Sequence, residues 1–231
     1  MARTRGAARF TKALDDPSLP ETRVIPVPAP VHPLRGDRDP AAVEPVPPVK
    51  FVWDEYFSAE RPVEADIGCG KGRFFLSRAR ENPGVDYLGV ERDLSRINCM
   101  DYTARSEGLD NFFLMRADAL PLVTEIIPDG VLRAVHFFFP DPWPKRKHHK
   151  NRLFKDVFVD GVFRILIPGG LFHVATDRPD YFGTMEKTLD SDPRFERIET
   201  LVREPRERTD FEVIFLSKNL PTFGASYRKK G

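Results

Sequence analysis

Three glycines follow an acidic residue in the segment Asp66-Ile-Gly-Cys-Gly-Lys-Gly72. Glycine allows a sharp backbone turn between a strand and a helix, and it lets a ligand approach the main chain closely. A nicotinamide-dinucleotide loop that starts at Gly68 would have its third glycine at position 73, where the sequence has Arg73. The carboxylate of Asp66 would repel a pyrophosphate but attract a ligand with an ammonium and a sulfonium. The segment therefore favours S-adenosylmethionine at Gly68 and Gly70, and a tight turn without a ligand is the alternative.

Acidic residues occur at or just after the ends of five successive predicted strands. They are Asp66, Glu91, Asp118, Asp141 and Asp177. Open parallel sheets bind ligands beyond the carboxyl ends of their strands, so these acids indicate a ligand site along one edge. Glu91 comes 23 residues after Gly68, close to the spacing of about 20 residues expected of an acid that holds ribose hydroxyls. Asp118 is placed to accept the adenine amino group, and a helix cap is the equally simple alternative.

A proline-rich loop and a basic segment follow the Phe137-Phe-Phe139 end of another predicted strand. Prolines on both sides of Asp141 restrict its backbone, which suits a carboxylate that must be aimed at a substrate. We name the segment after this loop the basic strip: Lys145, Arg146, Lys147, His148, His149, Lys150, Asn151 and Arg152. A basic run is often a solvated surface, but its position directly after the loop favours contact with RNA phosphates. We assign the histidine pair to this strip and predict no metal site, because further ligands at suitable spacing are missing.

Alternating strands and helices must position these residues. Apolar periodicity predicts helices over 74–82, 93–106 and 153–166 and strands over 63–67, 85–90, 112–115, 134–139 and 171–175. Two later segments, 195–202 and 211–217, also have strand character, and the short charged turn between them predicts an antiparallel pair. The pattern predicts an α/β fold with a mostly parallel sheet, helices on both faces and an antiparallel C-terminal strand.

The first 50 residues differ from the rest of the chain, because they contain ten of its 22 prolines. Prolines interrupt helices and strands, so residues 1–50 are predicted to be an extended or disordered arm before one domain over residues 51–231. A plain linker is the favoured interpretation of this arm. RNA contact through four of its basic residues is the alternative: Arg3, Arg5, Arg9 and Lys12.

Composition limits the class of protein. The chain has 231 residues, which suits one α/β domain with a tail. Two cysteines argue against a disulfide framework and favour a reducing cytoplasm. No apolar run approaches the ~18 residues of a membrane helix, and no apolar segment after the N-terminal arginines indicates a secretory signal. The formal net charge of +1 neither favours nor excludes a nucleic-acid partner. Both a monomer and a homodimer remain open.

Taken together, several of these segments resemble the bacterial-type tRNA (guanine-N(7)-)-methyltransferases over roughly residues 51–217. The resemblance rests on the glycine loop, the Tyr-Leu-Gly-Val-Glu91 strand, the Asp-Pro-Trp-Pro-Lys145 segment, the Ala-Thr-Asp177 end and Thr209-Asp-Phe-Glu212. It implies a Rossmann-like class I S-adenosylmethionine-dependent methyltransferase fold over residues 51–231, with tRNA as the partner. It assigns Asp66, Glu91, Asp118 and Asp141 to the cofactor. It assigns Lys145, Asp177, Thr209, Asp210, Phe211 and Glu212 to the substrate, and Lys147 to Arg152 to RNA.

Two positions depart from the family pattern. Asp66 replaces the usual glutamate, and Asp210 replaces the usual lysine of the Thr-Lys-aromatic-Glu motif. Guanine N7 has a lone pair and no proton, so its methylation needs alignment more than a base. We therefore predict that Asp141 is the catalytic residue and that Asp141 and Asp177 orient the guanine. The alternatives are an RNA methyltransferase acting on an exocyclic amino group, since Asp-Pro-Trp-Pro is a reordered form of that class's motif, and a non-catalytic RNA-binding protein.

Overall fold

The computed structural model of the chain describes residues 18–26 and 51–231. The strands are β1 (Val24–Ile25), β2 (Val63–Ile67), β3 (Asp86–Glu91), β4 (Phe112–Arg116), β5 (Leu132–Phe138), β6 (Leu166–Thr176), β7 (Phe195–Ile198) and β8 (Phe223–Lys229). The α-helices are α2 (Arg73–Glu81), α3 (Leu94–Ser106), α4 (Ala119–Pro121), α5 (Asp156–Ile165), α6 (Pro179–Ser191) and α7 (Asp210–Ser217). Shorter or irregular helices are η1 (Trp53–Glu55), the π-helix η2 (Leu122–Ile126) and η3 (Arg146–Asn151).

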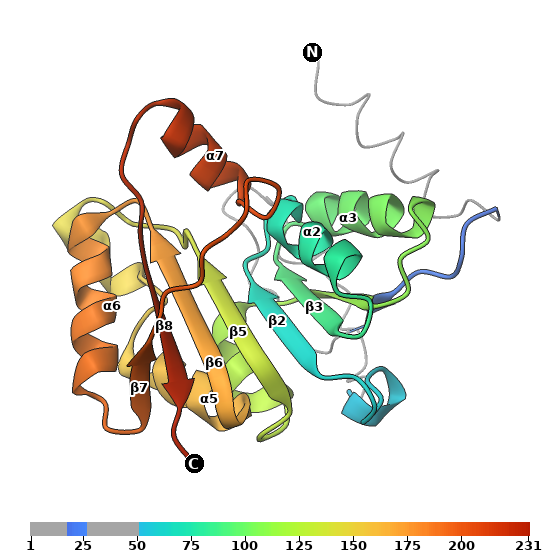
Figure 1. Cartoon of the computed structure of the whole chain (residues 1–231), viewed down its shortest axis with the longest axis horizontal. Coiled ribbons are helices and arrows are strands. Elements are labelled where there is room, and N and C mark those ends of the chain that lie inside the picture. Colours follow the sequence, from blue (N-terminus) through green and yellow to red (C-terminus); the bar gives the residue numbers. More distant parts are fainter. Residues whose placement is uncertain (1–17, 27–50) are drawn as a thin grey trace, which may run out of the picture.

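The strands of the described residues form one sheet in the order β1-β4-β3-β2-β5-β6-β8-β7 (Figure 1). Neighbours from β1 to β6 pair in parallel, whereas β8 pairs antiparallel with both β6 and β7. This topology confirms the predicted α/β class, the mostly parallel sheet and its antiparallel C-terminal end. It also places the ends of the parallel strands, where the predicted site residues lie, along one edge of the sheet.

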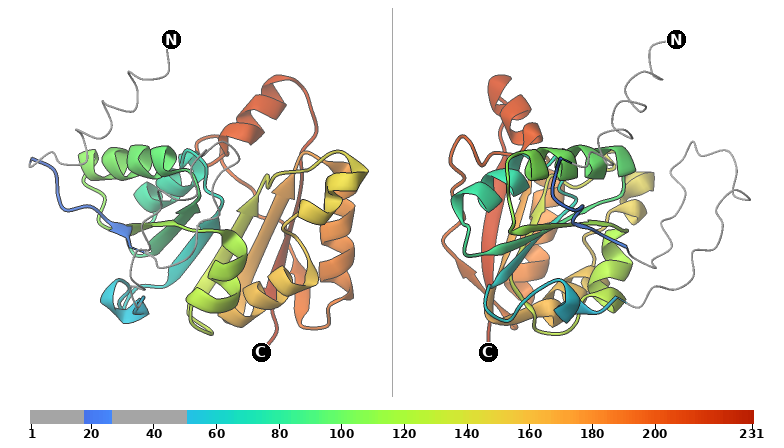
Figure 2. Two further views of the ribbon diagram at one scale, coloured as in Figure 1. Left: turned by 180° about the vertical axis from the view of Figure 1, so that it is seen from behind. Right: turned by 90° about the vertical axis from the view of Figure 1, so that its right-hand side faces the viewer.

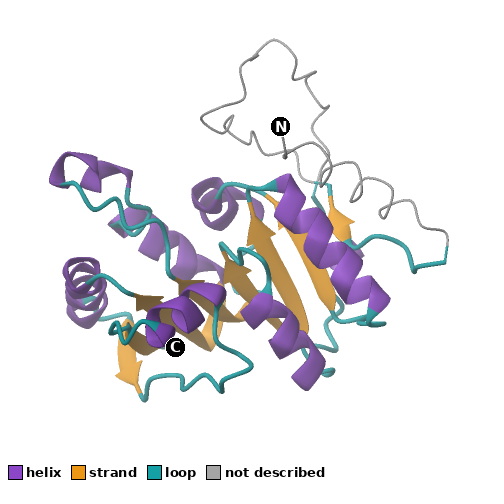
Figure 3. Cartoon of the chain, turned by 90° about the horizontal axis from the view of Figure 1, so that it is seen from above, coloured by secondary structure: helices purple, strands orange, loops and turns teal. Residues whose placement is uncertain are grey.

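Helices cover both faces of the sheet (Figure 3). On one face α2 and α3 pack on β3 and β4 through residues such as Phe75, Tyr87 and Ile97. On the other face η2, α5 and α6 form the larger core, which includes Phe158 and Met185. β2 is buried along its whole length, as expected of a central parallel strand covered on both sides.

The C-terminal third differs from the prediction in three respects. Residues 211–217 form helix α7 rather than a strand, α6 was not predicted, and β8 supplies the missing antiparallel strand. The predicted helix over 153–166 begins three residues later, at Asp156, and the Pro168-Gly-Gly170 segment that follows it lies within β6. None of the described helices is long and apolar enough to cross a membrane.

Part of the proline-rich arm belongs to the sheet. Val24 and Ile25 pair with β4, and the nearby Arg23 amide donates to Asp101 Oδ1 at 3.1 Å. Figure 2 shows residues 18–26, in blue, along the outer edge of the sheet. The prediction that prolines break every strand in the first 50 residues is therefore wrong for this segment, because it ends at Ile25, just before Pro26. The alternative of RNA contact through Arg3 to Lys12 lies outside the described residues.

Candidate active site

The glycine loop between β2 and α2 has a backbone that favours glycine. Gly68, Gly70 and Gly72 have φ values of 85°, 61° and 81°, in the left-handed region. The Gly68 and Cys69 amides donate to the carbonyl of Val90 at 2.8 and 3.0 Å, which holds the loop against the end of β3. A Cβ at Gly68 would have no atom of the described chain within 4 Å. The loop thus presents open main chain to a ligand.

The last glycine of the loop serves packing. A Cβ at Gly72 would lie 2.5 Å from Met100 Sδ of α3, closer than real contacts allow. The Gly72 carbonyl also accepts the first hydrogen bond of α2, from the Leu76 amide at 2.7 Å. Gly72 therefore lets α2 and α3 approach each other at the base of the loop.

Two carboxyl groups stand beside the glycine loop. Burial and the negative charge of Glu91 raise the pKa of Asp66 to about 8, although Arg203 opposes this shift. Glu91 Oε2 accepts from the Gly70 amide at 3.1 Å and from Arg96 at 3.2 Å. The two acids therefore lie close enough to repel each other. Such a site disfavours a pyrophosphate and fits the ammonium and sulfonium of S-adenosylmethionine.

Asp118 lies at the same edge, between β4 and α4. It takes the N-cap position of α4, and Arg92 Nε contacts its Oδ1 at 2.5 Å. The helix-cap interpretation thus describes the position of Asp118. Its ion pair with Arg92 connects the loop after β4 with the loop after β3. Its side chain is 14% exposed.

The loop around Asp141 has an unusual backbone. Phe139 and Trp143, two residues before and after Asp141, have φ values of 50° and 42°. Left-handed conformations are costly for large side chains and persist only where surrounding contacts enforce them. One such contact is the bond from the Phe139 amide to the Ala175 carbonyl of β6, at 2.8 Å. The Asp141 side chain is exposed at the sheet edge.

The basic strip forms η3 and the residues beside it. Lys145 is the N-cap of η3, and the ring of His148 within η3 lies edge-on to Trp143 at a centroid distance of 6.0 Å. The histidines are half-buried. The exposed members are Lys145, Arg146, Lys147, Lys150 and Asn151.

Arg152 differs from the exposed members of the basic strip. It was predicted to contact RNA, but its side chain is only 7% exposed. Its guanidinium donates to the Pro142 carbonyl at 2.9 Å and to Asp180 at 2.5 Å. Because these bonds occupy the guanidinium inside the protein, Arg152 is an internal contact of the loop and not a free cation of the basic strip.

The Thr209–Glu212 stretch begins helix α7, which stands beyond the ends of β5 and β6 (Figure 1). Thr209 Oγ1 accepts from the Glu212 amide at 3.1 Å, a normal helix cap. Phe211 is 53% exposed and lies 6.5 Å from Phe139 between ring centroids. The structure therefore brings this stretch, including the half-buried Asp210, beside the Asp141 loop.

Arg203 was missed by the sequence analysis. Its guanidinium pairs with both oxygens of Glu212, at 2.8 and 3.0 Å, and lies 4.4 Å from the centre of the Phe138 ring. Glu212 is buried by this pairing. The charge of Arg203 also opposes the rise in the pKa of Asp66. It thus connects α7 with the end of β5 and the cofactor side of the site. Asp177 is half-buried directly after β6.

A buried polar cluster beneath the site was also missed. His136 Nε2 lies 3.0 Å from Glu64 Oε2, and the His136 ring stacks on His173 at 5.1 Å. Burial lowers the pKa of His136, and burial together with His136 lowers the pKa of His173 to about 3. Hydrogen bonding to His136 and Arg133 lowers the pKa of Glu64 although burial opposes it. These histidines are therefore neutral parts of the core.

Comparisons with known proteins agree with this geometry. Residues 60–222 match the family described as “Putative methyltransferase”. The tRNA (guanine-N(7)-)-methyltransferase of Halorhodospira halophila is 38% identical over 180 residues, 76% of this chain and 78% of that protein. The enzyme of the same name from Alkalilimnicola ehrlichii is 36% identical over 181 residues, 77% and 76% of the two chains.

Among solved structures, the 16S rRNA methyltransferase KamB has a TM-score of 0.56 at 15% identity, over 75% of this chain and 90% of that chain. This likeness shows a shared fold. Together with the sequence relatives, it leads to one conclusion: the chain belongs to the tRNA (guanine-N(7)-)-methyltransferase family.

Proposed function

We propose that the protein transfers a methyl group from S-adenosylmethionine to N7 of a guanine in tRNA. The observation that supports this most is the single edge of the sheet shared by an acidic glycine loop, the Asp141 loop and the basic strip. The names of the relatives support the choice of tRNA as the acceptor.

The first part of the proposal concerns the cofactor. When bound, S-adenosylmethionine supplies an electrophilic methyl group on its sulfonium. Gly68 and Gly70 offer it open main chain, and Asp66 offers a carboxyl whose pKa is raised by burial and by the negative charge of Glu91. Glu91 ends β3 and suits the ribose hydroxyls, and Asp118 follows β4 and suits the adenine amino group.

The second part concerns the guanine. N7 attacks with an in-plane lone pair and loses no proton, so the protein must align the base instead of deprotonating it. Asp141 and Asp177 follow the neighbouring strands β5 and β6 and are suited to orient the N1–H and amino group of the guanine. Their negative charges also favour the positive charge that develops on the methylated base. Thr209 to Glu212 would close this side of the site.

The third part concerns the RNA backbone. Lys145, Lys147 and Lys150 are exposed and follow the Asp141 loop directly. Lysine ammonium groups bind phosphates mainly through charge, which positions an RNA without reading its sequence. These cations would hold the tRNA while its target guanine reaches Asp141.

Labelled methyl transfer to different acceptors tests this function. The purified protein is incubated with S-adenosylmethionine labelled in its methyl group and with unmodified tRNA, 16S rRNA or a protein mixture. We expect label in tRNA only. Equal or greater incorporation into rRNA or protein would refute the assignment of tRNA, and the absence of both transfer and cofactor binding would favour the RNA-binding alternative.

We infer that the protein acts in the cytoplasm, where a tRNA-modifying enzyme meets its substrate. Cys69 and Cys99 are free thiols, which agrees with a reducing compartment.

A further inference from the structure

Arg152 lies at the junction between the Asp141 loop and helix α6. Its Nε donates to the carbonyl of Pro142, the residue after Asp141, and its terminal nitrogen donates to Asp180 in the first turn of α6. Its guanidinium carbon also lies 4.4 Å from the centre of the Tyr181 ring. One side chain thus contacts the loop, a carboxylate and an aromatic ring at once.

The partners of Arg152 are themselves held in place. Tyr181 is fully buried, and its hydroxyl accepts from the Phe154 amide at 3.2 Å. The negative charge of Asp141 contributes to the raised pKa of Tyr181, after burial, so this ring lies within electrostatic reach of Asp141. Arg178 also contacts Asp180, at 3.0 Å. The anchor for Arg152 therefore combines the buried ring of Tyr181 with the carboxylate of Asp180, which is 40% exposed.

The Asp141 loop needs such an anchor. The left-handed conformations of Phe139 and Trp143 cost free energy, so contacts on both sides of Asp141 must hold the loop in this geometry. The Phe139 amide is fixed on β6, and Arg152 fixes the peptide that joins Pro142 to Trp143. These two contacts therefore fix the main chain on both sides of Asp141.

We propose that Arg152 is a positioning residue for methyl transfer, which holds Asp141 in its working orientation through Pro142, Asp180 and Tyr181. This inference rests on the proposed function, since it assigns Asp141 to the methyl-transfer step. It removes Arg152 from the RNA-contacting residues and leaves that role to the exposed lysines.

The chemistry of the site requires arginine. A guanidinium is planar and presents several donors in fixed directions, so it can reach a carbonyl and a carboxylate while it stacks on a ring. An ammonium is a compact point charge and would keep at most one of these contacts. A phosphate contact, by contrast, depends mainly on charge and would tolerate lysine. Substitution by lysine therefore separates the two roles.

The test measures single-turnover methyl transfer at saturating tRNA and cofactor for Arg152→Lys. We expect the rate constant to fall by about 10- to 100-fold, because a misplacement of about 1 Å can cost about 100-fold. The tRNA dissociation constant and its salt slope should stay within about twofold of wild type, whereas a lost phosphate contact would lower the slope by about 0.7–0.9. Asp180→Asn retains the arginine at position 152 but weakens the bond that anchors it. This variant should also slow methyl transfer.

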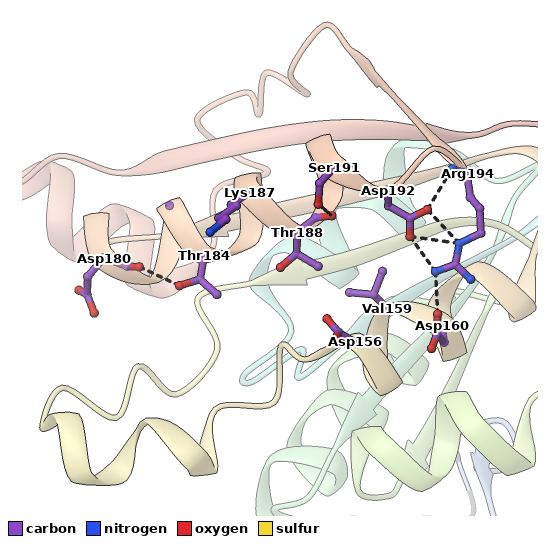
Figure 4. Close-up of a pocket in the computed structure, with 11 residues that line it drawn as sticks. Asp156, Val159, Asp160, Asp180, Thr184, Lys187, Thr188, Ser191, Asp192 and Arg194 are labelled. Carbon is purple, nitrogen blue, oxygen red and sulfur yellow. Dashed lines mark hydrogen bonds and ion pairs between the residues drawn. The ribbon is translucent and has the colours of Figure 1, made fainter.

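Arg194→Lys is the matched control. Arg194 also contacts two aspartates, Asp160 and Asp192, at 2.6 and 2.7 Å, and lies over an aromatic ring at 4.7 Å. Figure 4 shows that it lies at the far end of the α5–α6 groove from Asp180. Loss of its guanidinium should leave the transfer rate unchanged.

Two results would overturn the proposal. One is a wild-type rate constant in folded Arg152→Lys, or in Asp180→Asn if the arginine variant does not fold. The other is a transfer defect that disappears at saturating tRNA and comes with a lower salt slope, which would make Arg152 a phosphate contact. If the wild-type enzyme methylates another atom, the proposed function fails, but the comparison of rate with tRNA affinity still decides the role of Arg152.

Discussion

Cofactor binding should depend on pH through Asp66. In the free protein, burial and the charge of Glu91 raise the pKa of Asp66 to about 8, with Arg203 opposing the shift and the Cys69 thiol protonated nearby. The protonated form therefore predominates at neutral pH. A cation bound beside Asp66 stabilises the carboxylate, so binding must release a proton. Affinity for S-adenosylmethionine should consequently rise with pH below pH 8.

The size of the effect follows from the pKa. Each pH unit well below pH 8 should change the affinity by about tenfold, or about 1.4 kcal/mol. Between pH 6.0 and 7.5 the dissociation constant should fall about 20-fold. At pH 7 about 0.9 proton should be released per bound cofactor. The range ends at pH 7.5 because the amino group of the ligand loses its own proton near pH 8.

Isothermal titration calorimetry measures both quantities. Titrations at several pH values give the affinity, and two buffers with different ionisation enthalpies give the number of released protons. Asp66→Asn should bind with an affinity that no longer changes with pH, and Asp54→Asn, which changes an exposed carboxylate, should behave as wild type. A wild-type affinity that stays constant from pH 6.0 to 7.5, without proton release, would show that cofactor binding is not coupled to ionisation of Asp66.

Four further predictions concern separate parts of the molecule. Glu91→Ala should weaken cofactor binding by about 1–3 kcal/mol in calorimetry, because it leaves polar groups of the site unpaired. Gly72→Ala should lower the free energy of unfolding by about 1–3 kcal/mol in denaturant titrations, because its φ is left-handed and its neighbour is too close. Burial lowers the pKa of His173 to about 3, so below about pH 6.5 the unfolded chain binds a proton that the folded protein does not. The folded protein should therefore lose stability as the pH falls below about 6.5. Unfolding measured from pH 7 to 5 should show this loss, and His173→Gln should reduce it. Replacing Lys147 and Lys150 by alanine should lower the salt slope of tRNA binding by about 0.7–0.9 for each contact and leave cofactor affinity unchanged.

Each of these predictions has a contrary outcome. Unchanged cofactor affinity in folded Glu91→Ala would remove Glu91 from the site, and wild-type stability of Gly72→Ala would show that α3 adapts without cost. An identical pH dependence of unfolding in His173→Gln would assign the acid sensitivity to other groups. A wild-type salt slope in the lysine variant would make the basic strip a solvated surface.

The parallel part of the fold was predictable because its strands and helices have clear periodicity. The error at α7 arose because residues 211–217 contain aromatic and β-branched side chains, which are typical of strands. The helix prevails because Thr209 caps it and Phe215 packs on Phe139. Thr209-Asp-Phe-Glu212 fits the capping-box sequence, so this signal was present. Likewise, Pro179 at the first position of α6 was an available start signal.

The location of the site was predictable where an acidic residue stands at the end of a predicted strand, as for Asp66, Glu91 and Asp141. The cofactor and catalytic roles of these residues remain predictions. It was not predictable where the function of a charge depends on contacts distant in sequence. Arg152 lies among basic residues, and only its contacts with Pro142 and Asp180 show that its guanidinium is bound within the protein. The role of Arg203 likewise depends on its bond to Glu212, a residue that lies close to it only because α7 folds over the site. Local sequence gives the charge of such residues but not their partners.

The position of the transferred methyl group decides whether the protein methylates guanine N7 in tRNA, and it can be identified in the nucleoside product. Unmodified tRNA is incubated with the wild-type protein and labelled S-adenosylmethionine, digested to nucleosides and analysed by mass spectrometry beside authentic 7-methylguanosine. We predict one labelled nucleoside that coincides with 7-methylguanosine, and almost none in the same assay with folded Asp141→Ala. A label on an exocyclic amino group would exclude N7 as the methylated atom, and undiminished transfer by Asp141→Ala would remove Asp141 from the catalytic site.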